Sequence, residues 1–418
     1  MRFERLLSLR DSSLLYQALL IGYGLFFAGF FLVPRQLENY HQGFYYLGIA
    51  LFGLLLLPRG FQLLRANPLF WLLSAYLVYM VASTLWSDSF STDPDAVKRS
   101  IKLLQRAFYI IVLFILTAAL RDRDPERFQH MLMLVCIAAA VSAVLTLGLW
   151  YSDHPFPESR VWGFSLVRWT IFAAYSFGIF AVLSVYLMVR SPARWMSIAL
   201  GLSFLALFTY VWLAQSRTAF GAVLLGVLIA SMGTHARNRV MILLLVGLGI
   251  SVTSTLLIPS AFDYVFARGL SFRPDIWAAY LFRAMNNPIF GEGLLSDRTT
   301  FVYAPPLIGS VPDAHSAYIG TIRDGGIVGL SLLGGAFLAA LWCGIRSVTR
   351  SSCYLSLALA LVVIAYLATD TDRLITRTGA QWIFLWLPMA LIMSSPECLR
   401  SRKTANPDEP PATSTSPP

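Results

Sequence analysis

The feature that most constrains this chain is a series of apolar runs, each about 15 to 22 residues long, separated by short basic or polar stretches. A helix that crosses the hydrocarbon core of a bilayer needs about 20 apolar residues. Apolar residues make up 57% of the 418 residues and charged residues 13%, whereas soluble domains average about 45–50% and about 25%. The sequence therefore predicts a polytopic membrane protein and excludes an ordinary soluble enzyme.

Hydropathy predicts about twelve transmembrane helices, of which the second is the shortest. The predicted spans lie near residues 14–33, 44–57, 68–86, 101–120, 131–150, 169–189, 195–213, 218–233, 240–258, 327–345, 353–369 and 380–395. An even number of spans places both termini on the same side of the membrane. The expected fold class is thus an all-α polytopic membrane protein.

The distribution of basic residues predicts the orientation, because cytoplasmic connections are enriched in Lys and Arg. If the residues before the first span are cytoplasmic, this side holds seventeen of the 32 basic residues and eight of the 22 acidic ones. Topology then explains most of the net charge of +10, and no nucleic-acid partner is expected. We also expect the first span to be retained and the polar, proline-rich residues 396–418 to form a disordered cytoplasmic tail.

The cysteines are not expected to form disulfides. Cys136 and Cys343 fall inside predicted helices, and Cys353 and Cys398 fall on the reducing cytoplasmic side. The sequence also lacks the glycine-rich nucleotide loops and the Cys/His spacings that are typical of nucleotide-driven pumps and metalloenzymes.

One connection is much longer than the others. Residues 259–325 separate the first nine spans, within residues 1–258, from the last three, within residues 326–395, and they lie on the predicted non-cytoplasmic side. Long loops are usually functional. Inside this loop, residues 275–287 carry apolar side chains at helical spacing, after a first-turn proline at 274 and before an Asn-Pro stop. We therefore expect an amphipathic helix on the membrane surface.

Two polar segments frame this loop at the predicted outer membrane boundary. The first contains Arg217 between two apolar runs, and the second contains His315. A guanidinium at the bilayer centre costs about 2.5–3.5 kcal/mol, and less near the surface, so Arg217 needs an anionic partner. That partner is another helix, a lipid headgroup or a ligand phosphate. Composition alone does not assign either residue a catalytic role. Arg217 could simply extend to the lipid headgroups, and His315 could be an ordinary polar loop residue.

Two pairs of aspartates, Asp93 with Asp95 and Asp370 with Asp372, also lie on the predicted outer face. Such pairs can hold a divalent cation. Aspartates are common in short turns, and Arg373 follows the second pair, so solvated loop acids are the favoured interpretation. We expect no metal and no other cofactor.

Five short motifs occur in a fixed order along the chain. They are Ser216 to Ala219, Arg273 with Ile276 and Trp277, Asn287 to Gly293, His315 with Tyr318, and Asp324 to Leu330. This order resembles the O-antigen ligase and O-antigen polymerase superfamily of membrane glycosyltransferases. Members commonly carry Asn directly after the histidine, where this chain has Ser316.

The resemblance implies a GT-C-like fold that uses undecaprenyl-diphosphate-linked glycans on the periplasmic face. It implies catalytic roles for Arg217, Arg273 and His315. Two arginines can hold a diphosphate bidentately without a metal, and an imidazole can take a proton from the attacking hydroxyl. Further substrate contacts are expected from Arg160, Arg168, Tyr318 and Arg323, although Arg160 and Arg168 can instead pair with nearby acids such as Asp153 or Glu158.

Within this superfamily, the span number, the single long loop and the short tail favour a ligase of the bacterial inner membrane, with lipid A-core as acceptor and membrane lipids around it. The alternatives are a polymerase and a protein O-oligosaccharyltransferase, which use the same donor. A lipid or polysaccharide transporter is a remote alternative, because the arginines of interest gather at one membrane face and do not line a path through the midplane.

Overall fold

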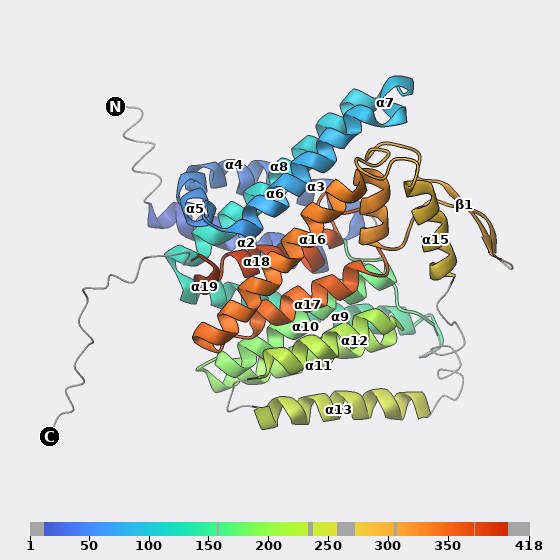
Figure 1. Cartoon of the computed structure of the whole chain (residues 1–418). Helices are drawn as coiled ribbons and strands as arrows, with labels where there is room; N and C mark the ends of the chain where they lie inside the picture. The colour runs from blue at the N-terminus through green and yellow to red at the C-terminus, as the bar shows by residue number, and fades with distance from the viewer. Residues whose placement is uncertain are drawn as a thin grey trace, which may run out of the picture.

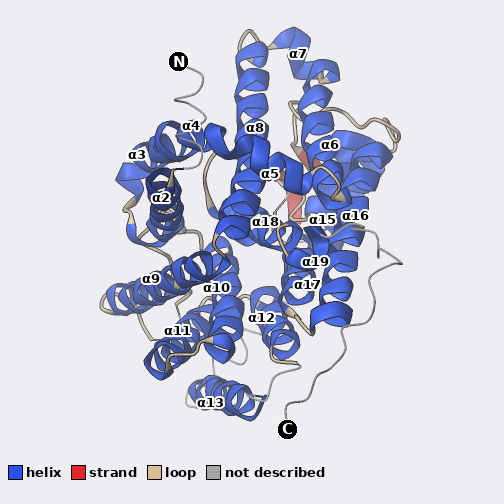
Figure 2. Ribbon diagram, turned by 90° about the vertical axis from the view of Figure 1, so that its left-hand side faces the viewer, coloured by secondary structure: helices blue, strands red, loops and turns tan. Residues whose placement is uncertain are grey.

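The computed structural model describes residues 12–156, 159–232, 237–256, 272–304, 307–371 and 373–399 (Figures 1 and 2). The first half contains α2 (Ser13–Leu32), α3 (Glu38–Gly43), α4 (Leu51–Gly53), α5 (Leu57–Leu64), α6 (Pro68–Ala82), α7 (Asp88–Thr92), α8 (Ala96–Arg123), α9 (Pro125–Tyr151), α10 (Thr170–Arg190) and α11 (Arg194–Leu213). The second half contains α12 (Arg217–Ala230), α13 (Arg237–Leu256), α15 (Arg273–Ala284), β1 (Thr300–Ala304), β2 (Leu307–Val311), α16 (Ala317–Ser351), α17 (Leu355–Leu367), α18 (Leu387–Met393) and α19 (Pro396–Leu399).

The chain is a multi-pass membrane protein. Within the described residues, eight helical segments are long and apolar enough to cross a membrane, and four shorter apolar helices accompany them. Each predicted span coincides with one of these segments, while the number of actual crossings stays a prediction. Large apolar side chains such as Leu25 of α2 and Leu245 of α13 are 60% exposed, as expected where a helix faces lipid.

Helix α10 forms the centre of the bundle. In its most apolar stretch of 18 residues, 83% of the residues are buried. The helix packs against α9, α11, α12 and α17. On the other side α16 packs against both α6 and α17, and α13 lies against α11 at the edge of the bundle (Figure 2). The helices α10, α12 and α17 therefore pack against one another, and residues at their ends are held close together.

The long loop is folded at one end of the bundle. The predicted amphipathic helix is confirmed as α15, which begins two residues earlier than expected and ends three residues earlier. It runs crosswise to α12 and α17, beside β1 (Figure 1), and buries Ile276 and Tyr280. Its position on a membrane surface stays a prediction.

The predicted all-α fold class is confirmed, and the structure adds one small β-hairpin in this loop. Strands β1 and β2 pair antiparallel, with Thr300 opposite Val311. In β1 the side chains alternate, since Val302 is 1% exposed whereas Phe301 and Tyr303 are 61% and 74% exposed. Strands of five residues are far too short to be found in a search for membrane spans. Their alternation of buried and exposed side chains, with a period of two residues, is visible only when the loop sequence is considered by itself.

Helix α16 begins ten residues before the predicted span. The sequence Asp324-Gly325-Gly326 was expected to end the loop, but the chain is helical from Ala317 and is interrupted only at Gly326, where φ is 61° and ψ is −161°. The polar residues before this kink are buried against neighbouring segments, so hydropathy could not include them in a helix.

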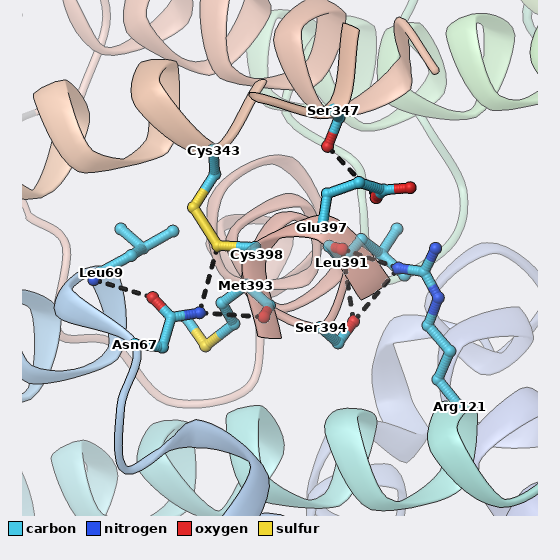
Figure 3. Close-up of a disulfide and its surroundings, with 10 residues drawn as sticks. All are labelled: Asn67, Leu69, Arg121, Cys343, Ser347, Leu391, Met393, Ser394, Glu397 and Cys398. Atoms are coloured by element: carbon cyan, nitrogen blue, oxygen red, sulfur yellow. Dashed lines mark hydrogen bonds between the residues drawn. A yellow bond between two sulfur atoms is a disulfide. The ribbon is translucent and has the colours of Figure 1, made fainter. Parts of the chain in front are cut away.

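The expectation that no cysteine forms a disulfide is wrong. Figure 3 shows Cys343 of α16 bonded to Cys398 of α19. The two residues are 55 positions apart, and the fold brings their Cα atoms to 5.3 Å. Asn67 and Arg121 hold the segment before Cys398 by donating to the backbone oxygens of Met393 (3.0 Å) and Leu391 (2.9 Å). Cys136 and Cys353 are not bonded.

Candidate active site

Arg217 is the first residue of α12. The tight turn before it has Gln215 in the left-handed region, with φ of 52°, and Ser216 caps the helix by accepting a hydrogen bond from the backbone N–H of Ala219 at 3.4 Å. The side chain of Arg217 is exposed. A helix N-terminus carries partial positive charge and unpaired N–H groups, so the arginine and the helix end together favour an anion.

Arg273 is the first residue of α15, and it forms an ion pair with Asp370, which follows α17. The side chain of Asp370 is 5% exposed and that of Arg273 is 25% exposed. Asp370 also accepts a hydrogen bond from the hydroxyl of Tyr175 (2.6 Å), and the hydroxyl oxygen of Thr369 lies 3.1 Å from the same carboxylate. Within the described residues the other N–H groups of Arg273 have no protein acceptor, so Asp370 fixes the guanidinium and leaves most of its five donors for a ligand.

A chain of polar contacts connects the two predicted catalytic arginines. Thr369, beside Asp370, donates to the hydroxyl of Thr218 at 3.0 Å, and Thr218 follows Arg217 in the first turn of α12. The path from Arg273 through Asp370 and Thr369 thus ends one residue from Arg217. The structure therefore brings to one place two arginines that are 56 positions apart in the sequence.

Helix α15 connects Arg273 to the segment that carries His315. Trp277, one turn after Arg273 and on the same face of the helix, donates from its indole N–H to the backbone oxygen of Ala314 at 3.0 Å. His315 follows with φ of 49° and a half-buried side chain. Ser316, which takes the place where the superfamily commonly has Asn, is 2% exposed, and its side chain makes no cap hydrogen bond to α16.

The Asn287 to Gly293 motif and the Asp324-Gly325-Gly326 motif are two halves of one backbone contact. The N–H groups of Glu292 and Gly293 donate to the carbonyl oxygens of Arg323 and Asp324 at 2.9 and 2.8 Å. A Cβ atom on Gly326 would lie 2.2 Å from the carbonyl oxygen of Ile289. The glycine is required because any side chain would push these two backbones apart.

Arg323 has a different environment from the one expected. It is 1% exposed and donates from Nε to Asp324 at 2.7 Å, and Arg298 donates to the other carboxylate oxygen of Asp324 at 2.5 Å. This buried triad connects the hairpin loop to α16. Arg323 is thus buried in this structure, and its contact with a substrate stays a prediction.

The other expected substrate contacts differ in position. Arg160 donates to the backbone oxygen of Ala214 at 3.2 Å, which places it beside the turn that carries Arg217. Arg168 lies over the Trp169 ring, 4.9 Å from its centroid. The hydroxyl of Tyr318, one turn from His315, donates to the backbone oxygen of Ile364 at 3.0 Å. Of these three, Arg160 and Tyr318 adjoin the segments described above.

Three of the four paired aspartates, those within the described residues, contact cationic side chains. Asp370 is neither solvated nor exposed, contrary to the favoured interpretation, and Asp372 lies outside the described residues. In the other pair, Asp93 contacts Arg99, and Asp95 lies 3.7 Å from Lys98. Among the residues that the structure describes, no group of three or more His, Cys, Asp or Glu side chains could hold a metal ion.

These observations define a class: a multi-pass membrane protein in which contacts of neighbouring residues bring the segments of two arginines and a histidine together at one end of the helix bundle. Residues 202–334 match the family model described as O-antigen ligase. The chain is also similar to an O-antigen ligase from Pseudomonas aeruginosa, with 29% identity over 381 residues that cover 89% of each chain. The resemblance seen in the motifs is therefore confirmed: residues 202–334 are similar to the O-antigen ligase family, and most of the chain is similar to a curated O-antigen ligase.

Proposed function

We propose that this protein is an O-antigen ligase, a glycosyltransferase that moves glycan from undecaprenyl diphosphate to a sugar hydroxyl of lipid A-core. The family domain at residues 202–334 and the similarity to a ligase over most of the chain support this class of reaction. The observation that carries the proposal is the geometry of α15, which holds Arg273 at its start and contacts the His315 segment one turn later.

The proposed roles follow from the chemistry of the leaving group. Arg217 and Arg273 bind the diphosphate oxygens, because planar guanidinium groups match phosphate bidentately. Charge that develops on the leaving diphosphate is then stabilised by groups already in place. Asp370 orients Arg273 for this contact and does not touch the substrate itself.

In the proposed step, the acceptor hydroxyl oxygen attacks the anomeric carbon of the donor glycan. The bond from that carbon to the diphosphate oxygen breaks, and its electron pair stays on undecaprenyl diphosphate. His315 takes the hydroxyl proton as general base. Because the nucleophile enters opposite the leaving group, the anomeric configuration inverts, and no step requires a metal.

Binding of the donor diphosphate by Arg217 and Arg273 would equally suit a polymerase or a protein O-oligosaccharyltransferase. The similarity of the whole chain to a protein named as a ligase favours the ligase. A transporter is disfavoured because the arginines gather at one end of the bundle and not through its middle. We place the site on the periplasmic face of the bacterial inner membrane, with both termini cytoplasmic.

An in vitro transfer assay tests the proposal. Purified protein is incubated with undecaprenyl-diphosphate oligosaccharide and lipid A-core, with and without chelator, and compared with His315→Ala and with His154→Ala as control. His154 is also a histidine on the predicted outer face, and it stacks on Trp150. We expect conjugated lipopolysaccharide that persists in chelator, falls by at least about 100-fold in His315→Ala, and is unchanged in His154→Ala.

Other products would change the assignment. Lengthened carrier-linked glycan without conjugation would make the protein a polymerase. Arg217→Lys separates a ligase from a transporter, because a lysine keeps the charge but loses the bidentate contact. We expect this variant to lose most of its activity. Full activity would contradict the proposed bidentate binding of the diphosphate by Arg217.

A further inference from the structure

A cavity of about 770 Å³ lies beside the candidate active site and is not used by the mechanism above. Its volume is typical of small-molecule sites. Most of its lining comes from three segments that are distant in the sequence: the first turns of α8, the loop before β1 and the segment after α17. Six of its lining residues are basic, namely Arg99, Lys102, Arg106, Arg298, Arg373 and Arg377.

The positive charge of this cavity is only partly neutralised by the protein. Four of the six cations have carboxylate partners: Arg298 pairs with Asp324, Arg377 with Glu38 at 3.0 Å, Arg373 with Asp313 at 3.8 Å, and Arg99 with Asp93. Asp297 is the one acidic lining residue among those described, and a hydrogen bond from the backbone N–H of Thr299 (3.0 Å) lowers the pKa of its carboxyl group. Outside these four ion pairs, two cations and one carboxylate line the cavity.

Of the six basic residues, Lys102 and Arg106 have no carboxylate partner within the described residues. They lie three and seven residues after Arg99, so all three side chains share one face of α8, and that face lines the cavity. Arg106 is half-buried and close enough to Arg377 for the two charges to repel each other. Cations held together without an acid favour an anion between them.

The cavity adjoins the candidate active site on two sides. Pro312 lines it and lies three residues from His315, at most about 11 Å along an extended chain. Leu374 lines it and lies four residues from Asp370, at most about 14 Å. Neither Arg217 nor Arg273 lines the cavity, so its cations are separate from the two arginines assigned to the donor diphosphate.

We propose that this basic cavity binds the phosphate groups of a phosphorylated acceptor saccharide and so presents the acceptor hydroxyl to His315. The inference rests on the proposed ligase function and adds the substrate class of the acceptor side: a glycolipid whose sugars carry phosphomonoesters. Lys102 and Arg106 contact the phosphate, because they are the cations without a protein partner. Arg99 and Arg377, which also line the cavity and are each paired with an acid, add positive charge near the phosphate.

The test compares intact acceptor with acceptor whose core phosphates have been removed. The full-length protein in lipid nanodiscs is assayed as wild type, as Lys102→Gln/Arg106→Gln and as Lys98→Gln. Lys98 is the matched control, since it is an exposed lysine on the same helix that does not line the cavity. Lys102→Gln alone, at an exposed position, is included in case the half-buried Arg106 affects folding.

For the wild type we expect the acceptor KM to rise roughly tenfold when the phosphates are removed, as for the loss of one charge-assisted contact. The double variant should show the same rise with intact acceptor, no further rise with dephosphorylated acceptor and an unchanged donor KM. Lys98→Gln should match the wild type. Equal use of both acceptors by the wild type, or equal impairment of the double variant on both, would overturn the proposal.

Binding measured without donor separates this inference from the proposed function. Direct binding of intact acceptor to wild type and variant needs no transfer, so it is informative even where transfer fails. We expect roughly tenfold weaker binding by the double variant in nanodiscs of either zwitterionic or anionic lipid. An effect of the variant that follows the lipid composition and not the acceptor phosphates would assign the cavity to lipid headgroups and overturn the proposal.

Discussion

Among single side chains, Asp370 makes the clearest case for a positioning residue. Its carboxylate is almost completely buried, pairs with Arg273 and accepts from Tyr175 at 2.6 Å. Replacement by Asn keeps the shape but removes the charge that holds the guanidinium. Because a displacement of about 1 Å near reacting atoms can lower a rate about 100-fold, we expect Asp370→Asn to lower kcat/KM for the donor about 10- to 100-fold.

The measurement is steady-state transfer with the donor varied, and Asp153→Asn, an exposed acid on the predicted outer face, serves as control. The acceptor KM should not change, because Asp370 acts only through Arg273. If kcat/KM for the donor were unchanged or higher in Asp370→Asn, the carboxylate would be a competitor for Arg273 and not the group that orients it.

Asp370 also shows why the candidate site was only partly predictable. Arg217, Arg273 and His315 lie in motifs that can be recognised along the chain, but the ion pair of Arg273 joins positions 97 apart. No local pattern indicates such a partner. The sequence did contain one usable signal, an acid placed at the outer end of an apolar run, where an unpaired carboxylate is costly.

Between elements, the contact of α16 with residues 287–293 depends on glycine. Gly326 has a φ of 61° and ψ of −161°, a region used almost only by glycine, and its missing side chain leaves room for the backbone of Ile289. We expect Gly326→Ala to lower the free energy of unfolding by about 2–4 kcal/mol, from backbone strain and overlap together.

Gly334, two turns further along α16, is the matched control. A Cβ atom there would meet nothing within 4 Å, so Gly334→Ala should raise stability by about 0.4–1 kcal/mol. Denaturation of both purified variants, followed by the loss of helical circular dichroism, measures the difference. Equal stability of the two variants would show that the two backbones can separate without penalty.

At this level the sequence predicts helices better than the contacts between them. Helix α15 was expected within three residues of its observed ends because the period of its apolar residues is a local property. The hairpin, the extension of α16 to Ala317 and the disulfide were not expected. Each depends on packing against segments that are distant along the chain, which neither hydropathy nor spacing records.

Over the whole molecule, the two ends of the bundle differ in kind. One end holds α15 and the hairpin, and the other holds α19 (Figure 1). The arginines, His315 and the basic cavity adjoin α15 and the hairpin, whereas the disulfide joins α16 to α19 (Figure 3). The charge distribution of the sequence assigns the second end to the cytoplasm. If this assignment is right, a reagent that cannot cross the membrane reaches the two ends from opposite sides.

Single cysteines at exposed positions test this orientation. Ser310 lies in β2, and Thr349 lies in the last turns of α16, near the disulfide end. In right-side-out membrane vesicles, we expect an impermeant maleimide to label Ser310→Cys fully and to label Thr349→Cys only after permeabilisation. The unsubstituted protein, whose Cys136 is buried and whose Cys343 and Cys398 are bonded, gives the background. Labelling of Thr349→Cys in sealed vesicles would invert the orientation and place the candidate active site on the cytoplasmic face, where it could not modify a periplasmic acceptor.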